Sequence, residues 1–436
     1  MARLPHRLIA TALATASALT AAACSPGPAA PAAAGRTTIT FWTMPFWIGR
    51  PDNLKHLVED FNASQNRIDV QLTVLDWQTG REAIKKAVTN GQGPDLWLAN
   101  NGLDLDLLTA GRMAPLDTLG YTAEDLGRFR PLVKVNEYQG RLYGAPLYFD
   151  VNVLLYRKDI LQQYGFTAPP RTWEELKSTA AAITTRSAAA GKKVMGWQFK
   201  GMDDHLNAIN PTWESFLCQA GGSLTSPDYR TSTQNTEAGR TALNYLKSFY
   251  TDRTSTLGTS ALNGFVEGEV AMFSFYQSVI SDIAAGNEKT KGKWAVAPMP
   301  TGPKSGCSMV GGHSLVARAG LPDPAAAGTF MRWFGSPSTS TRFMEFHGIF
   351  PYDTAKVPRE TRAAVDAFYN TDPSWAPIMA QFDRSTPDLL LQDRHGFATR
   401  WEAQKSDIVA GVDGRTPVDQ ALRGIDGKVD RELGGG

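Results

Sequence analysis

A long apolar run in the first half of the chain is the feature that most restricts its fold. After a turn at Gly140, the segment that ends near Lys158 is rich in Leu, Val, Tyr and Phe and contains one carboxylate, Asp150. This composition favours a strand over a helix. At roughly 3.3 Å per residue the run is longer than an ordinary strand. We therefore predict a strand that leaves one α/β lobe and enters another, with Asp150 facing the cleft between them.

Alternating and helical patterns before this run predict an α/β lobe with a mainly parallel sheet. Strands are expected over 37–42, 68–75 and 96–99, with helices over 54–61 and 81–88 between them. After the run, Thr172 is expected to cap a helix, with Glu175 completing a capping box. The further elements expected are strands over 195–199 and 294–298, helices over 212–220, 236–250, 401–410 and 417–433, and a Pro/Gly-rich second crossing over 299–308 that re-enters the first lobe at 311–316.

Composition is that of an ordinary globular protein with enough length for two lobes. The 436 residues are 42% hydrophobic and 20% charged, and their formal net charge is +1. Removing Arg3 and Arg7 with an N-terminal signal changes this charge from +1 to −1. A nearly neutral protein gives no argument for nucleic acid or an anionic membrane as a partner.

The N-terminus indicates export. Residues 1–23 combine a positive start with an Ala/Leu-rich segment that is too short to span a membrane. Small residues precede Cys24, as in a bacterial lipobox, although Ala21 stands where Leu is usual. We expect lipidation of Cys24 and a Pro/Ala-rich flexible tether over 24–36. The alternative is a plain secretory signal with an incidental cysteine.

Few residues have a pattern typical of catalysis or metal binding. Cys218 and Cys307 can form a disulfide in an exported protein, and two buried thiols are the alternative. Two cysteines and six scattered histidines do not form a metal-ligand pattern, so neither a metal nor a cofactor is expected. The chain lacks a serine-hydrolase elbow, a zinc-protease motif and a phosphate-binding loop. The absence of these motifs makes an enzymatic function a weaker hypothesis.

Three segments carry a resemblance to a known family: 140–146 (Gly-Arg-Leu-Tyr-Gly-Ala-Pro), 155–161 (Leu-Tyr-Arg-Lys-Asp-Ile-Leu) and 170–176 (Pro-Arg-Thr-Trp-Glu-Glu-Leu). Together they resemble the hinge segment of family 1 extracellular solute-binding proteins, the maltose-binding-protein-like receptors of ABC sugar importers. The resemblance implies a periplasmic-binding-protein type of α/β fold, with two lobes, a multi-strand hinge and a ligand cleft between the lobes. The expected lobes are 37–149 plus 313–365 and 150–312 plus 366–436.

A sugar presents hydroxyl groups and an apolar C–H face, which polar and aromatic side chains recognise together. Loops at the carboxyl ends of strands are where α/β sheets place ligands. The resemblance adds Asp150 as a ligand-contacting carboxylate and Trp401 as a stacking tryptophan. The expected ligand-binding residues are Phe46, Trp47, Asn100, Asn101, Asp150, Asn152, Asn210, Trp213, Phe275, Tyr276, Gly312, His313, Tyr352 and Trp401.

Some of these residues have structural alternatives. Asp150 can serve a hinge hydrogen bond or salt bridge, Trp213 and Trp401 can be core residues, and His313 can be structural. The segment after the first strand has Phe46 and Trp47 but no charged group, which weakens a malto-oligosaccharide assignment. The scarcity of Lys and Arg among these candidate cleft residues argues against a phosphorylated or highly anionic ligand.

The sequence therefore predicts a non-enzymatic, monomeric lipoprotein on the outer face of the cytoplasmic membrane. It would capture a mono- or oligosaccharide, with an aminosugar as one option, and deliver it to an ABC permease. The alternatives are an exported glycan-processing enzyme, which needs paired carboxylates about 5–9 Å apart, and a sugar-sensing lipoprotein without an importer.

Overall fold

A computed structural model describes residues 35–45, 52–76, 79–100, 104–127, 136–200, 209–227, 230–256, 259–284, 288–340, 372–385 and 397–433, and the single positions 342, 363, 367 and 370. The chain divides into two compact units, Met1–Arg36 and Thr37–Gly436. The signal peptide, Cys24 and nearly all of the tether lie outside the described residues. In the part that is described, no helix is both long and apolar enough to cross a membrane.

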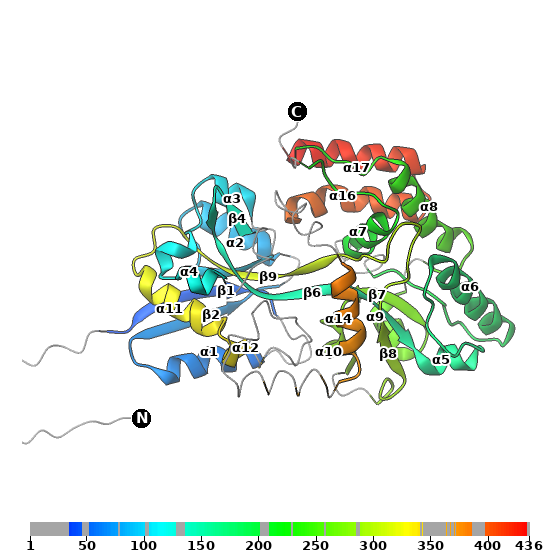
Figure 1. The fold of residues 1–436 in the computed structure, drawn as a ribbon, viewed down its shortest axis with the longest axis horizontal. Helices are drawn as coiled ribbons and strands as arrows, with labels where there is room; N and C mark the ends of the chain where they lie inside the picture. The colour runs from blue at the N-terminus through cyan, green and yellow to red at the C-terminus, as the bar shows by residue number, and fades with distance from the viewer. Residues whose placement is uncertain are drawn as a thin grey trace, which may run out of the picture. The chain divides into compact units, whose positions relative to one another are not determined.

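The second unit is an α/β structure (Figure 1). Its strands are β1 (Thr37–Thr43), β2 (Ile68–Val74), β3 (Leu96–Asn100), β4 (Glu137–Tyr138), β5 (Arg141–Leu142), β6 (Gly144–Arg157), β7 (Met272–Tyr276), β8 (Trp294–Ala297) and β9 (Val310–Ala317). Its helices are α1 (Asp52–Ser64), α2 (Gly80–Thr89), α3 (Leu105–Thr109), the 3-10 helix η1 (Leu116–Leu119), α4 (Ala123–Gly127), α5 (Lys158–Gln163), α6 (Trp173–Ala189), α7 (Ile209–Gln219), α8 (Glu237–Thr251), α9 (Ala261–Glu267), α10 (Val279–Ala284), α11 (Pro324–Phe334), α12 (Pro337–Ser340), α14 (Trp375–Arg384), α16 (Phe397–Val412) and α17 (Val418–Glu432).

One seven-stranded sheet runs through the unit in the order β2-β1-β3-β9-β6-β7, with β8 paired to β6. Strand β1 is parallel to β2 and β3, as the alternating strand and helix patterns predict. Strand β9 is antiparallel to both β3 and β6. A late segment of the chain therefore joins the early strands to the rest of the sheet.

Strand β6 is the predicted long strand, and its 14 residues belong to more than one core. Near its start, Ala145 and Leu147 pack in a first core with residues of β1, α1 and α11. Farther along, Leu154 packs in a helical core formed with α6, α7 and α8, and Val153 packs in a third core with α9 and α14. Figure 1 shows β6 and β9 side by side between these groups. The burial of apolar side chains at both ends explains why one strand serves two sets of elements.

The helix that follows begins with the predicted cap. The hydroxyl of Thr172 accepts the N–H of Glu175 at 3.2 Å. The Glu175 side chain accepts the N–H of Arg171 rather than that of Thr172. The reciprocal half of the capping box is therefore displaced by one residue.

Two local predictions are wrong. Residues 195–199 form no strand, and only an isolated bridge joins Met195 to Val270. The connection over 299–308 is not the second crossing, because β9 makes that crossing. Buried side chains hold the connection in place: Gln381 of α14 accepts the N–H of Met299, and Gln219 of α7 donates to the carbonyl of Cys307.

Candidate functional site

The crossing strands have one face lined by polar side chains. Alternate residues of a strand point to opposite sides of the sheet. The register pairs Tyr148 with His313 and Asp150 with Gly311, and β7 adds Tyr276 opposite Asn152. The opposite face is apolar there. We call the first side the polar face, and its members are Tyr148, Asp150, Asn152, Tyr276, Gly311 and His313.

Asp150 is buried, with 5% of its surface exposed. Its carboxylate accepts the N–H of Ser278 at 3.2 Å, at the start of α10. Burial raises the pKa of Asp150 to about 7, although hydrogen bonds from Ser278, Gln277 and Val151 favour the ionised form. The contact with Ser278 agrees with the structural alternative for Asp150, a hinge hydrogen bond. A ligand contact by this carboxylate stays a prediction.

A second interaction joins the same turn to β6. The side chain of Gln277 accepts the N–H of Val151 and donates to the carbonyl of Phe149 at 3.3 Å. Asp150 and Gln277 thus fasten the end of β7 to the middle of β6. This rigid connection fixes the backbone that displays the polar face.

Asn152 connects β6 to α7. Its amide nitrogen donates to the carbonyl of Pro211 at 3.1 Å and to the hydroxyl of Ser215 at 2.9 Å. The side-chain oxygen of Asn152 is buried and has no hydrogen-bond partner within the described part of the chain. The amide nitrogen is therefore committed to the scaffold, and the oxygen remains available as an acceptor.

His313 lies at the other end of the polar face. A hydrogen bond of 2.6 Å joins its Nδ1 to the hydroxyl of Tyr148. Burial, together with a smaller effect of the positive charge of Arg81 on α2, lowers the pKa of His313 to about 3. The imidazole is therefore neutral at physiological pH. His313 also pairs through its backbone with Asn100, the last residue of β3.

Trp401 on α16 lies beside the polar face. It packs with buried Met309, and Tyr276 packs against both. Its indole N–H donates to Glu214 Oε1 at 2.6 Å. With 7% of its surface exposed, Trp401 is also mostly buried, so its position fits both the stacking and the core interpretations.

Other predicted residues lie elsewhere. Trp213 is fully buried in the helical core, where its indole N–H donates to Gln234 at 2.6 Å. Asn210 is equally buried and accepts the amide of Gln404 at 2.7 Å. Phe275 packs against the third core, and Gly312 pairs with Phe149 on the apolar side. Phe46, Trp47, Asn101 and Tyr352 lie outside the described residues.

Sequence reasoning missed several residues that organise the site. Tyr148 and Ser278 hold or extend the polar face, and Glu214 and Arg400 surround Trp401. One sequence signal was available for Glu214. It follows Trp213 in a mostly apolar segment, and a charged residue needs a partner when it is buried.

Cys218 and Cys307 form a disulfide across 89 residues, with their Cα atoms 6.2 Å apart. This separation lies within the usual range for disulfides. The bond links the C-terminal part of α7 to the connection before β9. It therefore strengthens the attachment of this connection to the helical core.

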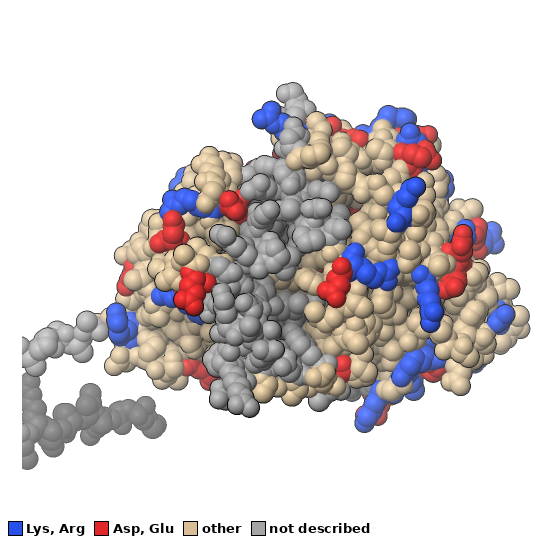
Figure 2. Space-filling view, viewed as in Figure 1, with Lys and Arg blue, Asp and Glu red and all other residues tan. Residues whose placement is uncertain are grey.

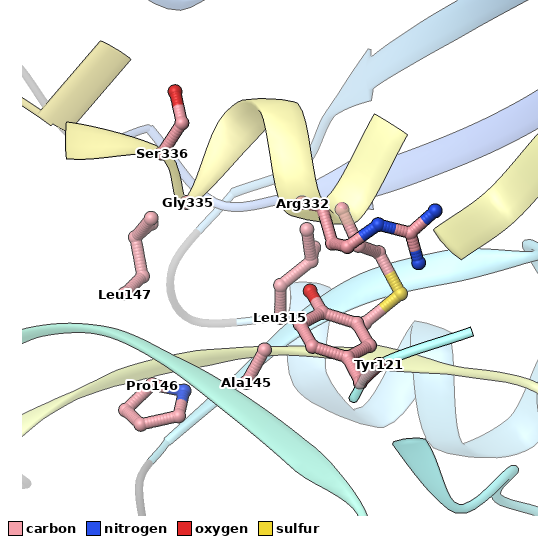
Figure 3. A pocket seen from close by; sticks show the side chains of 9 residues that line it. Tyr121, Ala145, Pro146, Leu147, Leu315, Arg332, Gly335 and Ser336 are labelled. Atoms are coloured by element: carbon pink, nitrogen blue, oxygen red, sulfur yellow. The ribbon is translucent and has the colours of Figure 1, made fainter. Parts of the chain in front are cut away.

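A small pocket of about 50 Å³ lies away from the polar face, between α11 and the neighbouring parts of β6 and β9 (Figure 3). Arg332 lies over the ring of Tyr121 at its edge, 5.6 Å from the ring centroid. None of the predicted ligand-binding residues that the structure describes lines this pocket. On the face drawn in Figure 2, basic and acidic side chains are interspersed among uncharged residues. In the described part of the chain, no group of three or more His, Cys, Asp or Glu residues could hold a metal ion.

The shared strands and the separate cores define the class: a binding protein of the periplasmic type. A model of the bacterial extracellular solute-binding protein family matches residues 56–374, well over half of the chain. The chain therefore belongs to this family. This confirms the family resemblance and the fold class that the sequence predicts.

Comparisons with individual proteins agree with this assignment. A probable ABC transporter-binding protein of Deinococcus radiodurans is 28% identical over 222 residues, which cover 48% of this chain and 51% of that protein. A putative binding protein of Brucella abortus is 25% identical over 252 residues, which cover 56% and 58%. The chain thus matches these curated relatives over only about half of their length.

Solved structures show the same fold at low sequence identity. The GacH receptor of Streptomyces glaucescens, determined unliganded and with acarbose, has a TM-score of 0.78 and 22% identity, and the match covers 92% of this chain and 99% of that one. UgpB of Mycobacterium tuberculosis, determined with glycerophosphocholine, has a TM-score of 0.74 and 19% identity over 92% and 99%.

Proposed function

We propose that this chain is the lipid-anchored, extracytoplasmic binding component of an ABC importer and that it captures a mono- or oligosaccharide. The sugar would bind between lobes made of 37–149 plus 313–365 and 150–312 plus 366–436. It would then pass unchanged to a membrane permease. The protein would act as a monomer, and Cys24 would carry the lipid.

The observation that carries this proposal is the polar face with an aromatic side chain at its edge. Asn152 offers an acceptor oxygen, and Tyr276 and Trp401 offer ring surface next to it. Sugars need this combination, because their hydroxyl groups and their C–H faces are recognised by different side chains. GacH, whose fold is similar, was determined with acarbose, which supports a carbohydrate ligand.

The test is a thermal-shift screen of the chain from position 24 onward, with Cys24→Ala, against neutral sugars, aminosugars and glycerophosphodiesters. A ligand that binds only the native state raises the unfolding midpoint by mass action. We expect one sugar class to raise the midpoint and Trp401→Ala to reduce the shift. A shift with glycerophosphodiesters alone, or with no compound, would contradict a carbohydrate ligand.

Two further measurements separate the other parts of the proposal. Chromatography of the sugar after incubation should return it unchanged, whereas cleavage would support a glycan-processing enzyme. Metabolic labelling with an azido fatty acid should tag the full-length protein in its bacterial host and should not tag Cys24→Ala. Equal labelling of both would contradict a lipid anchor at Cys24.

A further inference from the structure

A buried ion pair lies directly behind Trp401. Glu214 of α7 is fully buried, and Arg400 of α16 is 3% exposed. Arg400 Nη1 donates to Glu214 Oε1 at 2.7 Å, and the indole N–H of Trp401 donates to the same oxygen at 2.6 Å. One carboxylate oxygen therefore receives two hydrogen bonds from consecutive residues of α16.

Such a pair is a costly way to join two helices. Removing two charges from water costs free energy that their attraction often fails to recover, and apolar replacements are frequently no less stable. The hydrogen bond between the indole N–H and the carboxylate does, however, restrict the orientation of the indole ring. An indole with its N–H fixed on one oxygen cannot rotate freely, because N–H hydrogen bonds weaken steeply as they bend.

The orientation of this indole matters at the polar face. Trp401 packs with Met309, which precedes β9, and with Tyr276, which lies opposite Asn152. The backbone oxygen of Trp401 also accepts the side chain of Asn210 at 3.5 Å. Both ends of the residue are thus held from α7, while its ring borders Tyr276.

We infer that Glu214 is a positioning residue: its buried carboxylate, paired with Arg400, holds the Trp401 indole in the orientation that a ligand contacts. Arg400 keeps the carboxylate in place through its hydrogen bond to Oε1. The contact with a ligand rests on the proposed function, whereas the fixed orientation does not.

The test compares two double variants that both remove the ion pair. Glu214→Leu with Arg400→Met removes the acceptor for the indole, and Glu214→Gln with Arg400→Met keeps an acceptor oxygen. Neither variant leaves a lone buried charge, and circular dichroism checks that both fold. The orientation is read from ¹⁹F NMR of protein labelled with 5-fluorotryptophan, with the Trp401 signal assigned by Trp401→Phe. Binding is measured by calorimetry with maltotriose, and with glycerophosphocholine as a non-sugar comparison.

We expect the Gln variant to keep a single Trp401 signal and the Leu variant to shift or split it. Maltotriose affinity should fall about tenfold in the Leu variant, similar to the loss in Trp401→Ala and equal to about 1.4 kcal/mol. An unchanged signal in the Leu variant, or equal signals in both variants, would overturn the positioning role. If the wild-type chain binds neither probe, only the ligand contact fails, and the NMR comparison still decides the orientation.

Discussion

The carboxylate of Asp150 accepts the backbone N–H of Ser278, which lies 128 residues later in the chain, at a distance of 3.2 Å. This bond joins the middle of β6 to the turn between β7 and α10. It accounts for a carboxylate inside an apolar strand, because a buried carboxylate needs hydrogen-bond donors. The protonation of Asp150 should therefore affect stability in a measurable way.

The first prediction concerns Asp150→Asn. The pKa of Asp150 is raised to about 7 in the folded chain, so the folded chain retains a proton that the unfolded chain releases between about pH 4 and pH 7. Stability contributed by this group falls as pH rises through that window, by up to about 4 kcal/mol. Urea unfolding gives the free energy of unfolding of both proteins. The value for the wild type minus the value for Asp150→Asn should decrease from pH 4 to pH 7. If the free energies of unfolding of the two proteins changed with pH in parallel, this result would contradict the raised pKa.

The second prediction concerns His313→Asn and has the opposite sign. The pKa of His313 is lowered to about 3. On acidification the unfolded chain therefore binds a proton at this residue that the folded chain does not bind. Its contribution is fully present above about pH 6.5 and is lost as pH falls toward 3. The free energy of unfolding of the wild type minus that of His313→Asn should therefore increase with pH over that range. Tyr148→Phe is a matched control, because it removes the hydroxyl but not the titrating ring.

The third prediction concerns the disulfide. Replacing both Cys218 and Cys307 by Ser should lower the free energy of unfolding by about 2–4 kcal/mol, because the bond restricts a long loop in the unfolded chain. The effect should appear in denaturant midpoints. Reducing agent should destabilise the wild-type chain and leave the double variant unchanged. Equal midpoints for the two proteins under oxidising conditions would contradict this role.

The fourth prediction concerns Gly311→Ala. A Cβ at Gly311 would lie 2.8 Å from the hydroxyl of Tyr276, so the tyrosine ring must move. The Cζ and Cε1 atoms of the same ring would lie at 2.9 and 3.0 Å, so we expect a loss of about 1–3 kcal/mol in stability together with weaker sugar binding. Calorimetry and unfolding curves measure the two effects separately. Gly427→Ala, in helix α17 with its nearest neighbour 3.9 Å away, is the control and should leave binding unchanged.

Much of the fold can be predicted because its signals are local. The composition of β6 and the strand and helix patterns from Thr37 to Asn100 depend only on neighbouring residues. The connection over 299–308 differs from its prediction for the opposite reason. Its Pro and Gly residues are typical of a linker, but it is fixed by Gln219 and Gln381, which are distant in sequence.

In the candidate site, too, local sequence identifies some residues, whereas the contacts between distant residues cannot be predicted from it. Asp150 could be singled out because a carboxylate interrupts an apolar run. Its partner Ser278 could not, because that contact depends on how β7 meets β6. Trp213 was an equally reasonable candidate until its burial in the helical core was known. Pattern identifies residues that need an explanation, and only the packing distinguishes a ligand contact from a core contact.

Strand β9 lies between β3 and β6 in the sheet, although most of the chain precedes it. During synthesis, neither neighbour can complete its hydrogen bonds until residues 310–317 have emerged. Distant pairing of this kind slows folding. A chain that is still being made, or that is passing through a membrane channel from its N-terminus, therefore lacks the strand that would close its sheet. The order of strands along the chain therefore postpones completion of the sheet until residue 317 of 436 is available.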